Sequence, residues 1–375
     1  MEQLLSRSIL GVIIMVAVLS ISLLGSSPES LFHDGTIWEI KTSDKFEALC
    51  FLNALTGDPF YVPHYQRDFD HFSELFTPKV SRSLRTLFTV KKYSGVVLSA
   101  FLSSLFSVEN SESLSGLLES IDESEKLFRI HRDYGIFDWK ARLLFDGFLK
   151  RNLKVVVQFL IDNDFESYLD RNRAVVNYRK SQLTKYLNDK DIVTLIETHV
   201  GVPLASNRIT LFLVYFTDPH GISLFETNFI SSPRYGDDII LRNAIHEILH
   251  PIVDMSDPVL KNAVRVWKRD PFVMERFRNH DRSFGYNTFD GYVEENIVRA
   301  LELYLSEKAG VSIDTVDYFL NADGGMHVLA GALYTELKEQ NFGSTGETLI
   351  QFISRIIEVE LRAGEVEQAY RRATK

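Results

Sequence analysis

The hydrophobic pattern of the sequence changes near residue 208, and this change constrains the fold more than any other feature. From residue 45 to residue 190, apolar side chains recur three or four positions apart among charged ones, which is the period of amphipathic helices. Residues 209–217 (ITLFLVYFT) are instead rich in β-branched and aromatic side chains, and a turn sequence, DPHG, follows them. Residues 221–230 form a second strand-like run, as a hairpin partner or a separate strand. The sequence therefore predicts a mostly helical α+β fold with one small sheet.

Several helices are expected at particular places. Residues 96–108 (VVLSAFLSSLFSV) predict a short buried helix, and residues 139–186 predict one or two long helices with a solvated face. A helix capped by Asp237 or Asp238 is expected directly after the strands. Helical patterns then resume to the end of the chain, including residues 292–308 and 347–361.

The amino-terminal residues have the layout of a signal peptide. Arg7 precedes an apolar run of 16 residues, 9–24, and the small polar stretch 25–28 follows it. A bilayer span typically takes about 20 residues, so cleavage is favoured over an uncleaved membrane anchor. Residues 1–27 are therefore predicted to be a signal peptide or an N-terminal anchor. The rest of the chain is expected to be exported to the periplasm or the extracellular space.

Composition argues against a nucleic-acid partner. The chain has 51 acidic and 41 basic residues, a net charge of −10, which disfavours binding to a polyanion. Its 27 Phe and 15 Tyr mostly recur at helical spacing, as core residues do. We therefore expect no nucleic-acid binding, and membrane contact only through an uncleaved amino terminus.

Cys50 is the single cysteine of the sequence. It lies in an apolar run, which predicts a buried, unreactive thiol. Because an intrachain disulfide needs two cysteines, an exported chain of this composition must draw its stability from its core or from a metal ion.

The segment HEILH, residues 246–250, has the spacing of a zinc-binding helix. His246 and His250 stand four residues apart, so they project from one face of a helix about one turn apart. Glu247 follows the first histidine and lies beside such a metal without having to bind it, which suits a general base that activates water. The alternative is an ordinary polar helix face. Pro251 is expected to kink the helix just past the second histidine.

A third protein ligand is expected from residues 291–300 (GYVEENIVRA), which begin a helix downstream. Glu294 and Glu295 point about 100° apart on a helix, so only one of them can bind the metal. The spacing of the apolar positions places Glu294 nearer the buried face and slightly favours it. Stabilisation of the helix dipole is the ordinary reason for a glutamate at a helix start.

The chain resembles a family of largely uncharacterised bacterial proteins, a domain of unknown function grouped with the gluzincin-like metallopeptidases. The resemblance rests on HEILHP at 246–251 and EENIVRA at 294–300, and weaker similarity extends to residues 159–178 and 209–217. In that family the ligand glutamate stands five residues before the alanine of a Glu-x-x-Val-Arg-Ala pattern. This position corresponds to Glu295, which the resemblance therefore implies as the third ligand.

The change of pattern near residue 208 and the spacing of the histidines also predict the organisation of the chain and its cofactor. Residues 191–375 are expected to form a zincin-like metallohydrolase domain that binds Zn²⁺. Residues 28–190 are expected to form a helical N-terminal region ahead of it.

Other residues are candidates for stabilising an oxyanion or orienting a ligand. A tetrahedral intermediate is commonly stabilised by His, Tyr or Arg. Those that follow the first ligands are His280, Tyr286, Tyr292, Arg299, His327 and Tyr334. His327, after two glycines, is the first of these to test. Asp254, one turn beyond His250, is either a group that orients a histidine ligand or a helix-end carboxylate.

These features together predict a zinc-dependent metallopeptidase of gluzincin type. His246, His250 and Glu295 would bind the metal, and Glu247 would activate water for attack on a peptide bond. By analogy with other proteins of this class, the preceding strand is expected to align a peptide or protein substrate by edge pairing. Two alternatives are a zinc hydrolase of another amide or ester, which would use the same residues, and an exported binding protein. Glu247 argues against the latter, because a structural site needs no base.

Overall fold

The structure is a computed structural model that describes residues 32–94, 96–133, 137–281 and 288–375. The predicted signal peptide or anchor, residues 1–27, and Tyr286 lie outside the described residues. Residues Phe32–Lys375 form one compact unit. This unit is α+β and mostly helical, as the sequence predicts, with one small sheet.

The sheet has four strands in the order β1-β2-β4-β3. β2 pairs in parallel with β1 on one side and with β4 on the other, while β3 pairs antiparallel with β4. The second predicted strand, 221–230, is therefore two short strands, β3 and β4, which form a small hairpin with each other. β4 also pairs with β2, and these two strands run parallel. The strands are β1 (Ile37–Lys41), β2 (Arg208–Leu213), β3 (Ile222–Ser223) and β4 (Asn228–Ser231).

Two features of the sheet differ from the prediction. β2 ends at Leu213, and the rest of the predicted strand becomes a 3-10 turn, η4 (Tyr215–Thr217). β1 lies inside residues 28–190, which the sequence predicts to be helical only. This strand has five residues, too few to show a clear alternation, and it forms by pairing with residues about 170 positions away in the sequence.

β2 separates two hydrophobic cores. Ile209, Leu211 and Leu213 point to one face of the sheet and pack in the core that contains the C-terminal helices. Phe212 and Val214 point to the opposite face and pack among the N-terminal helices. Because both faces are covered, the strand is a continuous apolar run, which is why it stands out in the sequence.

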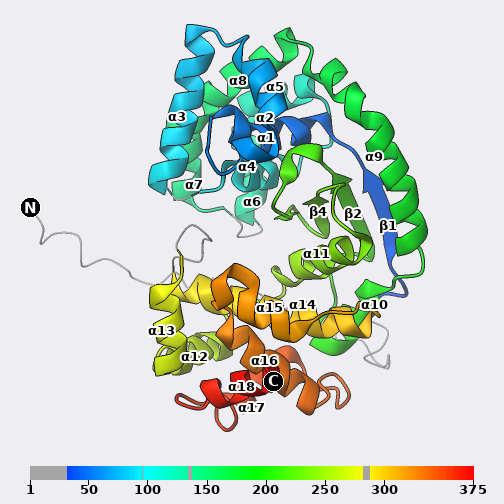
Figure 1. Ribbon diagram of the computed structural model, residues 1–375, viewed down its shortest axis with the longest axis vertical. Coiled ribbons are helices and arrows are strands. Elements are labelled where there is room, and N and C mark those ends of the chain that lie inside the picture. Colours follow the sequence, from blue (N-terminus) through cyan, green and yellow to red (C-terminus); the bar gives the residue numbers. More distant parts are fainter. Residues whose placement is uncertain (1–31, 95, 134–136, 282–287) are drawn as a thin grey trace, which may run out of the picture. The chain divides into compact units, whose positions relative to one another are not determined.

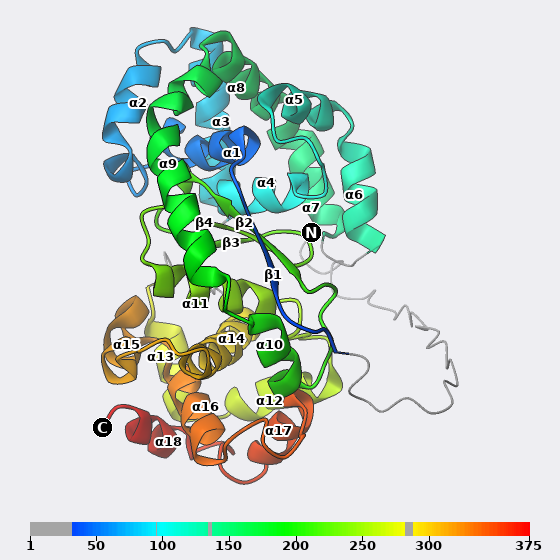
Figure 2. The same cartoon turned by 90° about the vertical axis from the view of Figure 1, so that its right-hand side faces the viewer.

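The helices from α1 to α8 and the start of α9 pack mainly on one face of the sheet, while the rest of α9 and α10 pack in the core on the other face (Figure 1). Cys50 is buried in α1, as expected. Figure 2 shows the long helix α9 running beside β1, which it contacts. These elements are α1 (Asp44–Leu55), η2 (Val62–His64), α2 (Gln66–Ser73), α3 (Pro78–Ser94), α4 (Leu98–Phe106), α5 (Leu114–Asp122), α6 (Ser124–Asp133), α7 (Trp139–Leu144), the π-helix η3 (Phe145–Leu149), α8 (Lys150–Asp162), α9 (Phe165–Leu187) and α10 (Ile192–Val200).

The remaining helices pack around α14, which contacts both α11 and α16 (Figure 1). They are α11 (Asp237–Leu249), α12 (Pro258–Trp267), α13 (Pro271–Asn279), α14 (Phe289–Lys308), α15 (Thr315–Asn321), η6 (Ala322–Gly325), α16 (Val328–Glu339), α17 (Leu349–Ile356) and α18 (Val366–Ala373). Among the helices that the structure describes, none combines the length and the apolar character that a membrane span requires.

The helix α11 carries the HEILH segment. Gly236 is its N-cap, and Asp237 and Asp238 occupy its first turn, where their charge favours the helix dipole; neither aspartate is the cap that the sequence predicts. The helix ends at Leu249 with His250 as its C-cap. Pro251 therefore ends the helix and does not kink it, because proline has no N–H to continue the ladder and restricts the residue before it.

Candidate metal centre

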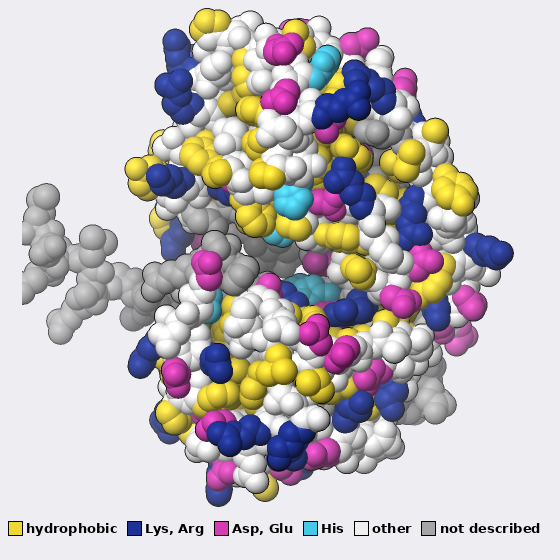
Figure 3. Space-filling view, in the orientation of Figure 1, with side chains coloured by type: hydrophobic (Ala, Val, Ile, Leu, Met, Phe, Trp, Pro, Cys, Tyr) yellow, Lys and Arg dark blue, Asp and Glu magenta, His cyan; other side chains and the backbone are white. Residues whose placement is uncertain are grey.

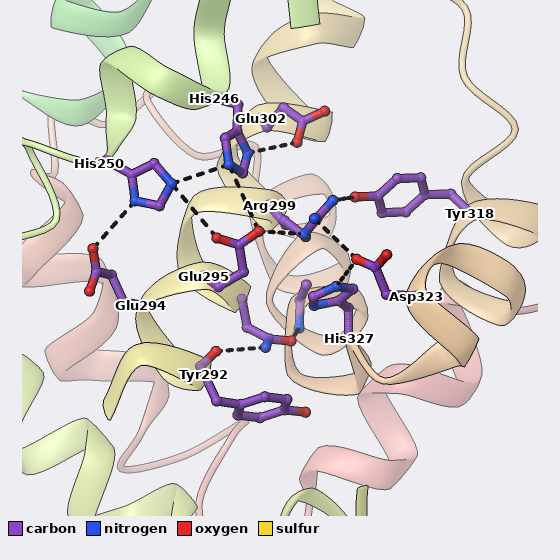
Figure 4. A network of polar contacts seen from close by, with 12 residues as sticks. His246, His250, Tyr292, Glu294, Glu295, Arg299, Glu302, Tyr318, Asp323 and His327 are labelled. Atoms are coloured by element: carbon purple, nitrogen blue, oxygen red, sulfur yellow. Dashed lines mark hydrogen bonds and ion pairs between the residues drawn. The ribbon is translucent and has the colours of Figure 1, made fainter. Parts of the chain in front are cut away.

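Three predicted ligands from two helices converge in the structure. His246 and His250 come from the end of α11, and Glu295 comes from the second turn of α14 (Figure 4). The two Nε2 atoms of the histidines are 3.2 Å apart. Glu295 places Oε1 3.8 Å from Nε2 of His246 and Oε2 3.7 Å from Nε2 of His250. One donor atom from each residue therefore faces a common point.

The spacing of these atoms fits a tetrahedral zinc ion. Zinc bonds to imidazole nitrogen and carboxylate oxygen are about 2.1 Å long, so two ligand atoms of a tetrahedral site lie about 3.4 Å apart. The observed separations of 3.2, 3.7 and 3.8 Å bracket that value. Two imidazoles and one carboxylate are also a ligand set of catalytic zinc sites, which use three protein ligands and leave one position open.

A carboxylate lies beside the second nitrogen of each histidine. Nδ1 of His246 is 3.1 Å from Oε2 of Glu302, and Nδ1 of His250 is 3.3 Å from Oε1 of Glu294. A carboxylate at Nδ1 holds the proton on that nitrogen and leaves the lone pair of Nε2 directed at the metal position. Both rings therefore present Nε2 to a common point.

Glu302 is itself held in place. Arg242 donates from Nε and Nη2 to Oε1 of Glu302 at 3.0 and 2.8 Å, while the other oxygen of the carboxylate faces His246. The sequence analysis did not find Glu302 or Arg242. Glu302 stands two turns beyond Glu295 on α14, and this spacing is the only sequence signal that points to it.

Glu294 and Glu295 have different positions in the structure. The side chain of Glu295 is 4% exposed and faces both Nε2 atoms, while that of Glu294 is 33% exposed and faces Nδ1 of His250. The periodicity argument for Glu294 is therefore wrong. It fails because α14 is buried on nearly all sides in its central turns, so its apolar residues do not mark one inner face.

The charges around Glu295 and His246 attract a cation. Burial opposes the charged form of Glu295, but Arg299 and the nearby histidines outweigh burial and lower the pKa of Glu295 to about 2. Burial also opposes the charged form of His246, but Glu295, Glu302 and Glu247 raise its pKa to about 9. The carboxylates thus favour positive charge where the two histidines meet.

Arg299 connects the ligand Glu295 to a second polar cluster. Its Nε lies 2.7 Å from Oε1 of Glu295, and its Nη2 donates to Asp323 at 3.1 Å. Its Nη1 donates to the hydroxyl of Tyr318. Nε2 of His327 lies 2.8 Å from Asp323, and the side chain of His327 is 1% exposed. His327 is therefore buried and contacts Asp323, which it can hold in place (Figure 4).

The predicted tyrosine candidates use their hydroxyls elsewhere. Tyr292 donates to the carbonyl of Met326 at 2.7 Å, and Tyr334 donates to Glu307 at 2.6 Å. Both contacts stabilise the packing of α14 against the segment that follows it. They leave these hydroxyls engaged in the protein.

Asp254 and His280 also bond to groups outside the cluster of metal ligands. Asp254 accepts from the backbone N–H and the hydroxyl of Ser256, so it is the carboxylate of a local turn. Nδ1 of His280 lies 2.6 Å from the carbonyl of Phe277. The carboxylates that face the two histidines in the way predicted for Asp254 are Glu302 and Glu294.

The side chain of Glu247, on α11, faces the backbone of the loop before β3. Burial raises its pKa above the ordinary value, while His246 and His250 oppose that shift. A side chain on Gly221, the residue before β3, would place its Cβ 3.0 Å from Oε1 of Glu247. The glycine is therefore needed for the close approach of this backbone to the carboxylate. The sequence analysis read Gly221 only as a turn residue.

The surface is hollowed in front of α11. Figure 3 shows a recess there, in the same orientation as Figure 1, with histidine and basic side chains at its edge. A recess of this kind gives the region around α11 access to solvent and to a ligand.

No protein-family model, curated protein or solved structure matches this chain. The resemblance to gluzincin-like peptidases therefore stays a prediction.

Proposed function

We propose that this protein is a zinc-dependent hydrolase with a zincin-like catalytic region. Nε2 of His246, Nε2 of His250 and the carboxylate of Glu295 would hold the ion. The observation that carries the proposal is their convergence at separations of 3.2 to 3.8 Å, with a carboxylate beside the other nitrogen of each histidine. A merely polar helix face would not require both rings to be oriented in this way.

The chemistry divides between the ion and Glu247. A zinc ion bound by these three residues would supply Lewis acidity to the water and carbonyl oxygen beside it. Glu247 accepts a proton from the attacking water and returns it to the leaving group. Burial raises the pKa of Glu247 above its ordinary value, which is the direction that favours a general base.

A peptide is the substrate class that we propose, because the ligands and the base are those of a gluzincin-type metallopeptidase. Gly221, the residue before β3, lies against Glu247, and Ser223 of β3 donates to the backbone carbonyl of Glu247 at 3.4 Å. β3 pairs only with β4 among the described strands, and α4 covers its outer edge: Ser104 donates to the carbonyl of Ser223 at 2.8 Å, and Ser107 accepts from the N–H of Phe225 at 2.9 Å. Edge pairing of a substrate, as expected from the sequence, is therefore not part of this proposal for β3.

The decisive experiment compares the wild type with Glu247→Gln. Both proteins are expected to bind one zinc ion, measured by elemental analysis, because Glu247 is not a ligand. Hydrolysis of a mixed peptide library is expected from the wild type and to fall by at least about 100-fold in the variant, since general bases contribute roughly 10²–10⁴ in rate. Glu358→Gln, a glutamate at the end of α17, is the matched control.

Three results bear on the alternatives. Absence of zinc from the wild type would overturn the proposal. Bound zinc with hydrolysis of esters or non-peptide amides alone would assign the same residues to another substrate class. Equal peptide hydrolysis by the wild type and Glu247→Gln would exclude Glu247 as the base.

We also propose that this hydrolase acts outside the cytoplasm, because residues 1–27 have the layout of an export signal. Fractionation of cells that make the full chain tests this, and recovery of the protein in the cytoplasmic fraction alone would contradict it.

A further inference from the structure

The loop ahead of β3 places a histidine beside the proposed site. Gly221 lies against the carboxylate of Glu247, so the residue before it, His220, stands next to the base. The backbone N–H of His220 donates to the carbonyl of Thr217 at 2.9 Å. The hydroxyl of Thr217 in turn donates to the carbonyl of His220 at 3.0 Å. These two bonds close the loop and fix the backbone of His220.

The ring of His220 is held from the N-terminal helices. The hydroxyl of Tyr61 lies 2.9 Å from Nε2 of His220. The ring of Phe60 stacks on His220 with an interplanar angle of 21°. Side chains about 160 residues away in the sequence therefore hold the ring of His220, although His220 itself lies in the loop before β3.

The contact with Tyr61 fits a ring that carries its proton on Nδ1. Tyr61 is buried, and burial raises the pKa of its hydroxyl, so the phenol is neutral and its O–H can donate to Nε2 of His220. Burial also lowers the pKa of His220 to about 4, with Lys91 and His64 adding to that effect, so the ring is neutral. When Tyr61 donates to Nε2 of a neutral ring, Nδ1 carries the hydrogen.

Nδ1 of His220 has no hydrogen-bond partner among the residues that the structure describes, and the side chain is partly exposed. The ring is close enough to Asp323 to feel its charge, and Asp323 is bound to Arg299, which contacts Glu295. His220 therefore stands near both Glu247 and this polar cluster.

We infer that His220, oriented by Tyr61, is a catalytic residue that donates Nδ1–H to the carbonyl oxygen of the substrate as negative charge develops on it. The inference rests on the proposed hydrolase function. A neutral imidazole donor whose position is set before the reaction stabilises such an oxyanion without reorganising. Tyr61 is a positioning residue, because it acts through the ring of His220.

The test uses the full chain loaded with Co²⁺, whose visible spectrum reports binding at a zinc site. One probe is a dipeptide analogue in which a phosphonate replaces the scissile amide and imitates the charged intermediate. The other probe is acetohydroxamate, a small metal-binding ligand used to check that the metal centre is intact. Dissociation constants of both are measured by spectral titration.

His220→Ala is expected to weaken phosphonate binding by roughly 100-fold, the typical loss for one oxyanion donor, and to leave acetohydroxamate binding unchanged. His220→Asn, whose amide occupies nearly the position of Nδ1–H, is expected to recover part of the loss. Tyr61→Phe is expected to give a smaller loss than His220→Ala. His71→Ala, an exposed histidine on α2, is the matched control and is expected to bind like the wild type.

The outcomes separate this inference from the proposed function. Wild-type phosphonate affinity in both His220→Ala and Tyr61→Phe would overturn the role of His220 and leave the zinc hydrolase standing. Loss of both probes in His220→Ala and also in His220→Asn would show a role in building the site and would likewise overturn a donor role. Failure of the wild-type chain to bind Co²⁺ or zinc would overturn the proposed function and this inference together.

Discussion

Two adjacent glutamates on α14 differ in what they contact, and this difference gives the first prediction at the residue scale. Glu295 faces both Nε2 atoms of His246 and His250, whereas Glu294 faces Nδ1 of His250. Glu295→Ala is therefore expected to abolish zinc binding at micromolar concentrations. Glu294→Ala is expected to weaken zinc binding by about tenfold, because it removes only an orienting contact. Competition with a chromogenic chelator measures both affinities, and the reverse order would contradict the assignment.

Glu302 gives the second prediction. It joins Arg242 to Nδ1 of His246, so removing it frees the ring to rotate and leaves the guanidinium without its partner. Glu302→Ala is expected to lower zinc affinity roughly 10- to 100-fold while the fold is kept. Glu307→Ala, a glutamate farther along the same helix that contacts Lys338, is the control and should leave zinc affinity unchanged. Equal affinities in the two variants would show that Glu302 does not orient the ligand.

At the scale of elements, a buried carboxylate joins α1 to the end of β2. Glu47 on α1 accepts the backbone N–H groups of Tyr215 and Phe216 at 2.7 and 3.1 Å. Burial raises its pKa from 4.5 to about 8, and these two donors reduce the shift without reversing it. The folded state therefore holds a proton on Glu47 that the unfolded chain has already released at neutral pH.

This linkage predicts the direction of a pH effect. A raised pKa in the folded state stabilises the protein below pH 4.5, and that stabilisation is lost as the pH rises from 4.5 to about 8. Glu47→Gln cannot titrate. Between pH 4.5 and about 8, its free energy of unfolding should therefore increase relative to that of the wild type by on the order of 3 kcal/mol. Urea unfolding of both proteins at pH 5 and pH 8 measures the difference. A constant difference between them would show that Glu47 titrates alike in both states.

At the scale of the whole described unit, the proposed ion would join two helices that anchor different parts of the fold. α11 packs against the sheet and α14 packs against the C-terminal helices. A ligand that binds only the folded state stabilises it, by about 2.7 kcal/mol at a concentration 100 times its dissociation constant. Removing zinc with a chelator is therefore expected to lower Tm by several degrees in the wild type.

The same treatment of Glu295→Ala provides the control for that measurement. Its Tm should not respond to chelator or to added zinc, because a required ligand is missing. A chelator response of equal size in the wild type and the variant would place the stabilising metal elsewhere.

Features that depend on short-range geometry could be predicted from the sequence. His246 and His250 are one helical turn apart, and this spacing alone brings their side chains together once the segment is helical. The strand at β2 could be predicted because burial on both faces makes it continuously apolar. The position of Pro251 likewise marks the end of α11, although the sequence analysis interpreted it as a kink.

Long-range packing decided the rest. The contacts of Glu295 with His250, of Glu302 with His246 and of Tyr61 with His220 join residues 45 to 159 positions apart in the sequence. β1 became a strand because β2 offered it an unpaired edge, not because five residues specify one. The sequence by itself determined which residues of α11 can bind a metal, since a helix repeats locally. Only the tertiary structure decided which carboxylates and which ring surround them, because nothing in the period of α14 or in the loop before β3 encodes the distance to another helix.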